Sequence, residues 1–234
     1  MEPYQSEDEQ LEALKKWWKE NGQSTVIGIV AAIVIVFGWR GWQDHQQGQS
    51  EAASQLYTSL LEADRLATES DKQRATASHL AEQLKTEFPG SGYAVMAALH
   101  SARYAVMNEQ WSEAEQQLEW VLAEAETDDL KMMARYRLAK VRYQQGELDD
   151  ALELSKQLTD KGLAPAALEL QGDIYQAMNR NEQALAAYRD ALTKLEMMDK
   201  PVSNPLLEMK IVDLTAALEN EAASSETAAV ESAS

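Results

Sequence analysis

The stretch Thr25–Trp39, TVIGIVAAIVIVFGW, lies in the longest run of the chain without a charged residue. A helix from Asn21 to Trp42 would be roughly 33 Å long at about 1.5 Å per residue, which matches a hydrocarbon core of about 30 Å. We therefore predict one transmembrane helix at residues 23–42. The alternative is a buried helix of a soluble core, which we favour less because no other segment is apolar on all faces.

Basic residues are concentrated before the apolar run, at Lys15, Lys16 and Lys19, and only Arg40 follows it closely. By the positive-inside rule the N-terminus should be cytoplasmic. In a bacterial inner membrane, residues 43 onward would then be periplasmic, as in a single-pass type II protein. A cleaved signal peptide is the competing interpretation. It is disfavoured because the start is acidic and because bulky residues follow the run where a peptidase needs small ones.

The flanks of the span carry two further patterns. Ser6–Glu9 fits a capping box, so residues 1–22 should hold a short amphipathic helix that ends near Asn21 and Gly22. Paired tryptophans bracket the span as interfacial belts, at Trp17, Trp18, Trp39 and Trp42. Small residues also fall at every fourth position, at Ser24, Gly28 and Ala32, and such a stripe lets a second membrane helix approach. Small residues are common in membrane helices, so this stripe can also be incidental.

The composition favours an all-α protein. Ala, Glu, Gln and Leu recur throughout, and the 234 residues include only five prolines and ten glycines. The formal net charge of −18 would repel phosphate, which excludes nucleic acid as a partner. The absence of cysteine excludes disulfides and thiolate metal sites.

Residues 43–220 read as a helical repeat that follows a polar connection at residues 43–49. Ala139 and Gly172 are 33 residues apart, as are Ala151 and Ala184, and these small residues match the helix crossings of a tetratricopeptide repeat. A third copy, displaced by 37 residues, has Ala102. We predict a solenoid of about four helix pairs with a final helix from Asn204–Pro205 to Leu218. Residues 221–234 lack periodicity and should be disordered.

The first helix of each pair should line a binding groove. In this register the groove residues are Met96, Leu99, Arg103, Val106, Met107, Met133, Tyr136, Lys140 and Tyr143, followed by Glu169, Asp173 and Gln176. The first two groups are apolar and rich in Met, as adaptable binding surfaces are. The alternative is that they are core residues at helical spacing. Arg135 and Arg142 fall where the repeat is usually apolar, so the register around them is open.

The sequence indicates no catalytic site. His45, His79 and His100 are far apart, without metal-ligand spacing, and no hydrolase, Walker or dinucleotide motif occurs. We therefore expect no enzyme activity, no cofactor and no metal.

The opening EPYQSEDEQLEALKKWWKENG, the span ending GWRGWQ, and the repeats LAKVRYQQGELDDAL and LELQGDIYQAMNRNEQALAAYRDAL together resemble the YfgM family, the ancillary subunits of the SecYEG translocon. The resemblance covers residues 2 to about 218. It implies an inner-membrane protein that associates with SecYEG and with a PpiD-like periplasmic chaperone. It also implies that the protein assists newly translocated client polypeptides.

The expected function is thus a membrane-anchored interaction module beside the export channel, in contact with inner-membrane lipid. One alternative is a tetratricopeptide scaffold for envelope or cell-division complexes, which the sequence hardly separates from the first. Another is a cytoplasmic signalling regulator that acts through residues 1–22.

Overall fold

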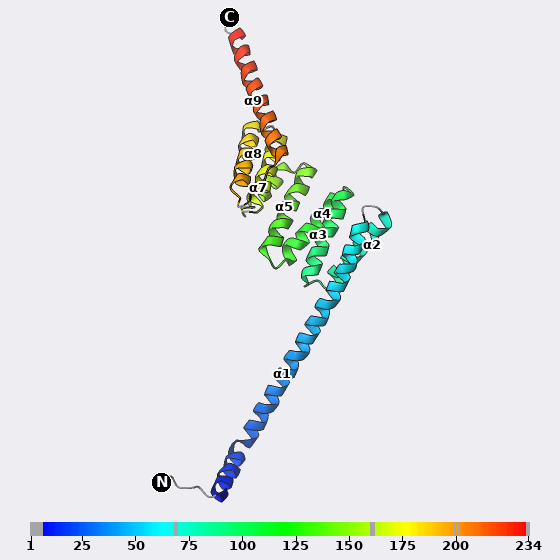
Figure 1. Cartoon of the computed structure of the whole chain (residues 1–234), viewed down its shortest axis with the longest axis vertical. Coiled ribbons are helices and arrows are strands. Elements are labelled where there is room, and N and C mark those ends of the chain that lie inside the picture. The colour runs from blue at the N-terminus through cyan, green and yellow to red at the C-terminus, as the bar shows by residue number, and fades with distance from the viewer. Residues whose placement is uncertain (1–6, 68–69, 160–161, 199, 201, 233–234) are drawn as a thin grey trace, which may run out of the picture. The chain divides into compact units, whose positions relative to one another are not determined.

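The computed structural model describes residues 7–67, 70–159, 162–198, 200 and 202–232, and all regular structure in these ranges is helical (Figure 1). The all-α prediction is confirmed. The helices are α1 (Glu7–Leu66), α2 (Asp71–Glu87), α3 (Gly92–Met107), α4 (Trp111–Glu124), α5 (Asp128–Gln145), α6 (Leu148–Lys156), α7 (Ala164–Ala177), α8 (Asn181–Glu196) and α9 (Pro205–Ser232). The chain divides into two compact units, residues 1–54 and 55–234.

The first unit is the N-terminal part of α1, which is helical without interruption from Glu7. The sequence predicted breaks near Gly22 and at residues 43–49, and the structure has neither. Near Gly22, two side-chain contacts support the helix. The Trp18 indole covers Gly22, and the Asn21 side-chain amide donates to the Trp17 carbonyl at 3.2 Å. Residues 43–49 are polar but compatible with a helix, and the Gln47 side chain donates to the Glu51 carboxylate one turn later at 2.9 Å.

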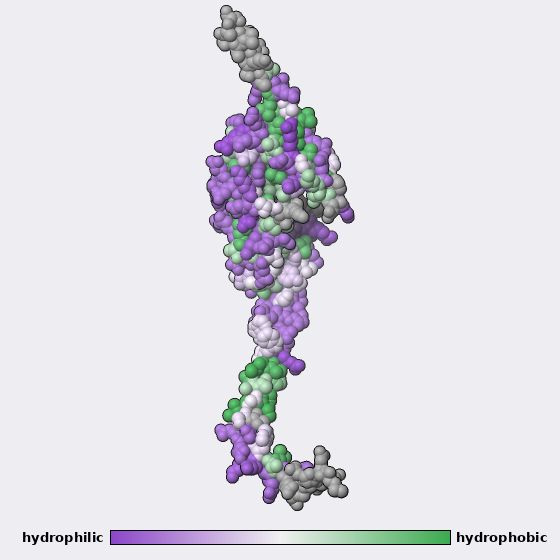
Figure 2. Space-filling model, turned by 90° about the vertical axis from the view of Figure 1, so that its left-hand side faces the viewer, coloured by the Kyte–Doolittle hydropathy of each residue, from purple (hydrophilic) through white to green (hydrophobic). Residues whose placement is uncertain are grey.

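The apolar residues of this unit are exposed. Ile35 is 69% and Phe37 67% exposed, and Figure 2 shows the hydrophobic band on the surface. Among the described residues, only the Val26–Leu66 part of α1 is long and apolar enough to cross a membrane, and its most apolar window has no buried residue. The alternative of a buried soluble-core helix is therefore wrong, since a core helix would be covered by its neighbours.

The second unit is built from helix pairs. The end of α1 packs with α2 and α3 through Ala63, Ala77 and Tyr104, and the pairs α3/α4, α5/α6 and α7/α8 follow. Helix α9 packs on α8 and closes the series. The predicted solenoid of about four pairs is confirmed. The predicted crossing residues are all buried, namely Ala102, Ala139, Ala151, Gly172 and Ala184.

The turns inside the last three pairs share one geometry. Each has a residue in the left-handed region, at Glu109 (φ 57°), Gly146 (φ 80°) and Asn179 (φ 58°). The next amide donates back into the preceding helix, as from Gln110 to Ala105 at 2.8 Å and from Arg180 to Tyr175 at 2.8 Å. These are Schellman-type helix ends. Their recurrence at the same 37- and 33-residue displacements sets the register of the pairs.

Helix α9 is longer than the final helix that the sequence predicted. It continues to Ser232, so residues 221–232 are helical where we expected disorder. The segment is rich in Ala and Glu, which are strong helix formers even where no neighbour packs on them. Residues 233 and 234 of the expected tail, and Ser6 of the expected capping box, lie outside the described residues.

Candidate protein-binding face

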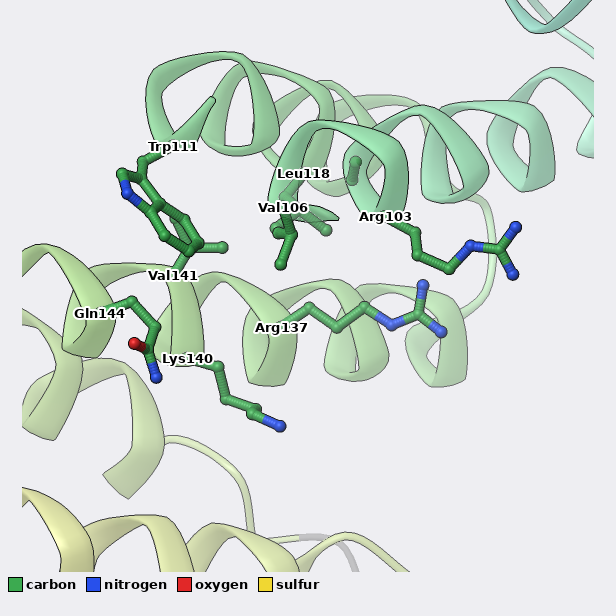
Figure 3. Close-up of a pocket in the computed structure, with 9 residues that line it drawn as sticks. Arg103, Val106, Trp111, Leu118, Arg137, Lys140, Val141 and Gln144 are labelled. Atoms are coloured by element: carbon green, nitrogen blue, oxygen red, sulfur yellow. The ribbon is translucent and has the colours of Figure 1, made fainter. Parts of the chain in front are cut away.

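The helices α3, α5 and α7 are the first members of successive pairs, and we call the surface that they form the first-helix face. A cavity of about 300 Å³ opens on it between α3, α4 and α5 (Figure 3). We call this the α3–α5 cavity. Its lining residues are Ala102, Arg103, Val106, Trp111, Leu118, Arg137, Lys140, Val141 and Gln144.

The two ends of the α3–α5 cavity differ in character. Trp111 and Val141 lie at one end, and the guanidinium groups of Arg103 and Arg137 point toward the other (Figure 3). Partial burial lowers the pKa of Arg137, and the neighbouring Arg103 charge lowers it further. The cavity therefore joins an apolar wall to a cationic rim, and the rim charges repel one another.

Within the described residues, the three rim cations have unequal partners. Arg103 pairs with Asp64 on α1, which also accepts a hydrogen bond from the Tyr104 hydroxyl. Lys140 stacks its ammonium over the Tyr136 ring at 5.8 Å from the centroid. Neither Lys140 nor Arg137 forms an ion pair with a described carboxylate. Two of the three rim cations thus have no carboxylate partner in the part of the chain that the structure describes.

Asp64 also faces His100, whose Nδ1 lies 3.5 Å from the carboxylate. Burial lowers the pKa of His100, and together with the nearby charges of Arg103 and Arg137 it outweighs the raising effect of Asp64. His100 is therefore neutral at pH 7, and Asp64 keeps Arg103 as its charged partner. This contact fixes the Arg103 side chain at the edge of the cavity.

The structure places the predicted groove residues in three kinds of environment. Arg103, Val106 and Lys140 line the α3–α5 cavity, and Met96, Met107 and Met133 are exposed by more than a third. Leu99 is buried in the core between α3, α4 and α5. Tyr136 and Tyr143 are half-buried and pack against a core cluster that includes Leu170 and Ile174. The binding role of all these residues stays a prediction.

Sequence reasoning missed several residues that line the α3–α5 cavity. Arg137 and Gln144 lie three residues before and four after Lys140, so the helical period alone could have added them to the predicted stripe. Trp111 and Leu118 come from α4, a second helix that we did not assign to the groove. Only the packing of α4 between α3 and α5 shows that they reach this face.

The α7 end of the first-helix face is closed by α9. Lys210 donates to Glu169 at 2.9 Å and to Asp173 at 2.7 Å. The Tyr188 hydroxyl donates to Asp173 at 2.7 Å and to Gln176 at 3.1 Å. We call these contacts the α7–α9 network. Glu169, Asp173 and Gln176, which we expected to line a groove, thus already have polar partners on α8 and α9, and their role in binding stays a prediction.

The open question of register is answered at Arg142. Its guanidinium is half-buried and pairs with Glu115 on α4 and with Glu147 after the turn. An arginine is tolerated at a usually apolar position because both carboxylates compensate its charge. The register with Ala139 and Ala151 at the crossings therefore holds.

The predicted small-residue stripe lies on the apolar part of α1. Ser24 and Ala32 are exposed, and no atom lies within 4 Å of a Cβ built on Gly28. The Ser24 hydroxyl donates to the Asn21 carbonyl at 3.1 Å. Helix packing at this stripe stays a prediction.

No cluster of three metal-ligating side chains occurs within the described ranges. The first-helix face offers apolar side chains and cations to a partner, and its role in binding stays a prediction.

Comparison with known proteins agrees with this geometry. A family model described as a tetratricopeptide repeat-like domain matches residues 15–216. An "Ancillary SecYEG translocon subunit" of Haemophilus influenzae is 31% identical over 79% of this chain and 88% of the relative. The chain belongs to this YfgM family.

Other members of the YfgM family show similar matches. The relative from Aggregatibacter actinomycetemcomitans is 34% identical over 79% of this chain and 88% of its own length. The one from Escherichia coli K12 is 28% identical over 92% of this chain and the whole relative. Among solved structures, a crystal structure of TPR-like repeats from Podosopora anserina matches with a TM-score of 0.56 at 18% identity. It covers 74% of this chain and 92% of that one. This last match shows the fold alone.

Proposed function

We propose that the protein is a membrane-anchored interaction module of the SecYEG export channel that acts by binding, without catalysis. The observation that carries the proposal is the unburied apolar segment of α1 in a chain whose second unit is a tetratricopeptide-like solenoid. The relatives named as ancillary SecYEG translocon subunits supply the partner.

The proposed orientation places residues 1–22 in the cytoplasm and the solenoid in the periplasm. The three lysines before the span support it, since basic residues are retained on the cytoplasmic side. The solenoid would then stand at the exit of the channel. The anchor raises its effective concentration there, so weak contacts with a PpiD-like chaperone or with emerging clients suffice.

Co-purification tests this proposal. The full-length protein, tagged at its C-terminus and extracted from bacterial inner membrane in mild detergent, should recover SecY, SecE, SecG and a PpiD-like chaperone. A matched variant with residues 25–39 replaced by an unrelated span of the same length shows whether the anchor sequence contributes. Recovery of cell-division proteins in place of channel subunits would overturn the proposal in favour of an envelope scaffold.

Orientation is measured separately. Single cysteines placed at Ser50 and at Gln10 of this cysteine-free chain are labelled with a membrane-impermeant maleimide in spheroplasts. Labelling at position 50 but not at position 10 is expected. The reverse pattern would contradict the periplasmic placement.

A further inference from the structure

We propose that the α3–α5 cavity binds one large aliphatic or aromatic side chain of an extended polypeptide segment whose neighbouring residues are Asp or Glu. This inference rests on the proposed function and deepens it, because it assigns a chemical class to the segment that the solenoid takes.

The size of the cavity favours a single anchor side chain. About 300 Å³ is at the lower end of the range for small-molecule pockets. Val106, Leu118 and Val141 supply aliphatic walls, and the Trp111 ring closes one end. Burial of one Leu or Phe side chain in such surroundings contributes enough free energy to anchor a weak complex.

The charge of the rim favours acidic neighbours for that anchor. The half-buried cations Arg142 and Lys210 each have at least two carboxylate partners, whereas the more exposed Arg137 and Lys140 on the rim have none within the described residues. Partial burial lowers the pKa of Arg137, and repulsion from the neighbouring Arg103 charge lowers it further. A carboxylate placed at the rim would compensate both cations and relieve that repulsion.

The remaining surface argues for a short acidic segment rather than a long polyanion. The chain as a whole has a net charge of −18, so an extended phosphate backbone would meet repulsion beyond the rim. A segment with one or two carboxylates beside its anchor needs only the charges that line the cavity. The positive charge that can attract an acidic ligand is thus limited to the rim of the cavity, which favours a short acidic polypeptide segment over a long polyanion.

Peptide binding to the full-length protein in maltoside micelles tests the proposal. The probes are fluorescein-labelled 12-residue peptides with acetylated and amidated ends, in which one Leu, Ile or Phe is flanked by Asp and Glu in a Gly/Ser background. Matched peptides carry Asn and Gln in place of the acids, and others carry Ser in place of the anchor. Fluorescence anisotropy reports binding.

We expect the acidic, anchored peptides to bind at least tenfold more tightly than either matched set. The double substitution Arg137→Gln and Lys140→Gln should weaken their binding at least tenfold. Lys194→Gln, an exposed lysine on α8, should leave it unchanged and serves as the control. Since neither Arg137 nor Lys140 is ion-paired within the described residues, circular dichroism should show the double variant folded.

Several results would overturn the proposal. One is the absence of peptide binding, and another is equal binding of the acidic and amide peptides. A third is short-chain phosphatidylglycerol that binds the parent but not the double variant while no peptide does so, which would identify a lipid site. Because these measurements need no channel, their failure is distinguishable from a failure to co-purify SecYEG.

Discussion

The two ends of the first-helix face occupy equivalent repeat positions but have opposite chemistry. Arg103, Lys140 and Asp173 succeed one another at displacements of 37 and 33 residues, so they are the same position in three pairs. At the α3–α5 cavity that position is a cation on an open rim, whereas on α7 it is a carboxylate bound to Lys210 of α9. A repeat fold therefore keeps its crossing residues small, while another repeat position can be an open cation in one pair and a carboxylate bound to the capping helix in the next.

The largest effect on stability is expected at the α7 end of the first-helix face, which α9 closes and which is tightly packed at Gly172. A Cβ on Gly172 would lie 2.3 Å from the buried Tyr188 ring. Gly172→Ala should therefore cost about 3 kcal/mol through overpacking, although alanine is the better helix former. Thermal unfolding of the full chain in detergent, followed by circular dichroism, should show a fall of roughly 6–12 °C.

Gly92→Ala is the control for this change, because nothing lies within 4 Å of the added methyl group. Combining Gly172→Ala with Tyr188→Leu should recover part of the loss by removing the ring that clashes. If Gly172→Ala melts at or above the melting temperature of the parent, the Tyr188 ring does not pack against Gly172. The description of tight packing at the α7 end would then be wrong.

The next effect concerns the α7–α9 network. Lys210→Gln leaves Glu169 and Asp173 without their cation and should cost about 2 kcal/mol. Hydrogen exchange measured by mass spectrometry should show loss of protection in α9, with α3 and α4 unchanged. Lys194→Gln changes an exposed lysine with no ion pair among the described residues and should have no effect. Uniform loss of protection across the solenoid would mean that the two ends are not independent.

Alkaline pH should weaken the closed end selectively. Burial and the hydrogen bond to Asp173 raise the pKa of Tyr188 above its ordinary value of 10.0. For Lys210, burial acts to lower the pKa, but hydrogen bonds to Asp173 and Glu169 outweigh it and the net shift is upward. A raised pKa in the folded state means stability that is complete below the unfolded value and lost as pH rises through the folded one.

Tyr188→Phe removes one of these groups. The variant should lose about 1 kcal/mol of free energy of unfolding at pH 7, because Phe lacks the hydroxyl that donates to Asp173. It should also reduce the decline in stability above pH 10. Urea unfolding at pH 7, 9 and 10.5 measures the loss at pH 7 and the decline at high pH. If stability falls equally with pH in variant and parent, ionisation of Tyr188 does not cause the decline.

The smallest effect is expected at the open end. Arg137→Gln removes a cation that has no ion pair within the described ranges and lies beside Arg103, so the free energy of unfolding should stay within about 0.5 kcal/mol of the parent or rise. Arg142→Gln, on the same helix, breaks pairs with Glu115 and Glu147 and should lose about 1 to 2 kcal/mol. If Arg137→Gln and Arg142→Gln lose the same free energy of unfolding, Arg137 makes a stabilising contact that the structure does not show.

Local patterns predicted much of this fold. The buried alanines at positions 102, 139 and 151 were found from their spacing, because a helix crossing admits only small side chains whatever surrounds it. Breaks were predicted less well, since a polar stretch such as residues 43–49 satisfies helix geometry without any turn. At the candidate site, Arg103 and Val106 followed from the stripe on α3 and Lys140 from the stripe on α5, whereas Trp111 required knowing that α4 reaches between these helices.

By itself the sequence determined an apolar helix long enough to span a membrane and a series of helix pairs, because both follow from spacing along one chain. Tertiary structure alone decided which part of the first-helix face is free. Asp173 and Lys140 have the same repeat position, but Lys210 is 37 residues further along the chain than Asp173, and only folding brings it onto that carboxylate. The α3–α5 cavity stays open because, among the described residues, no helix places such a partner on Lys140 or Arg137.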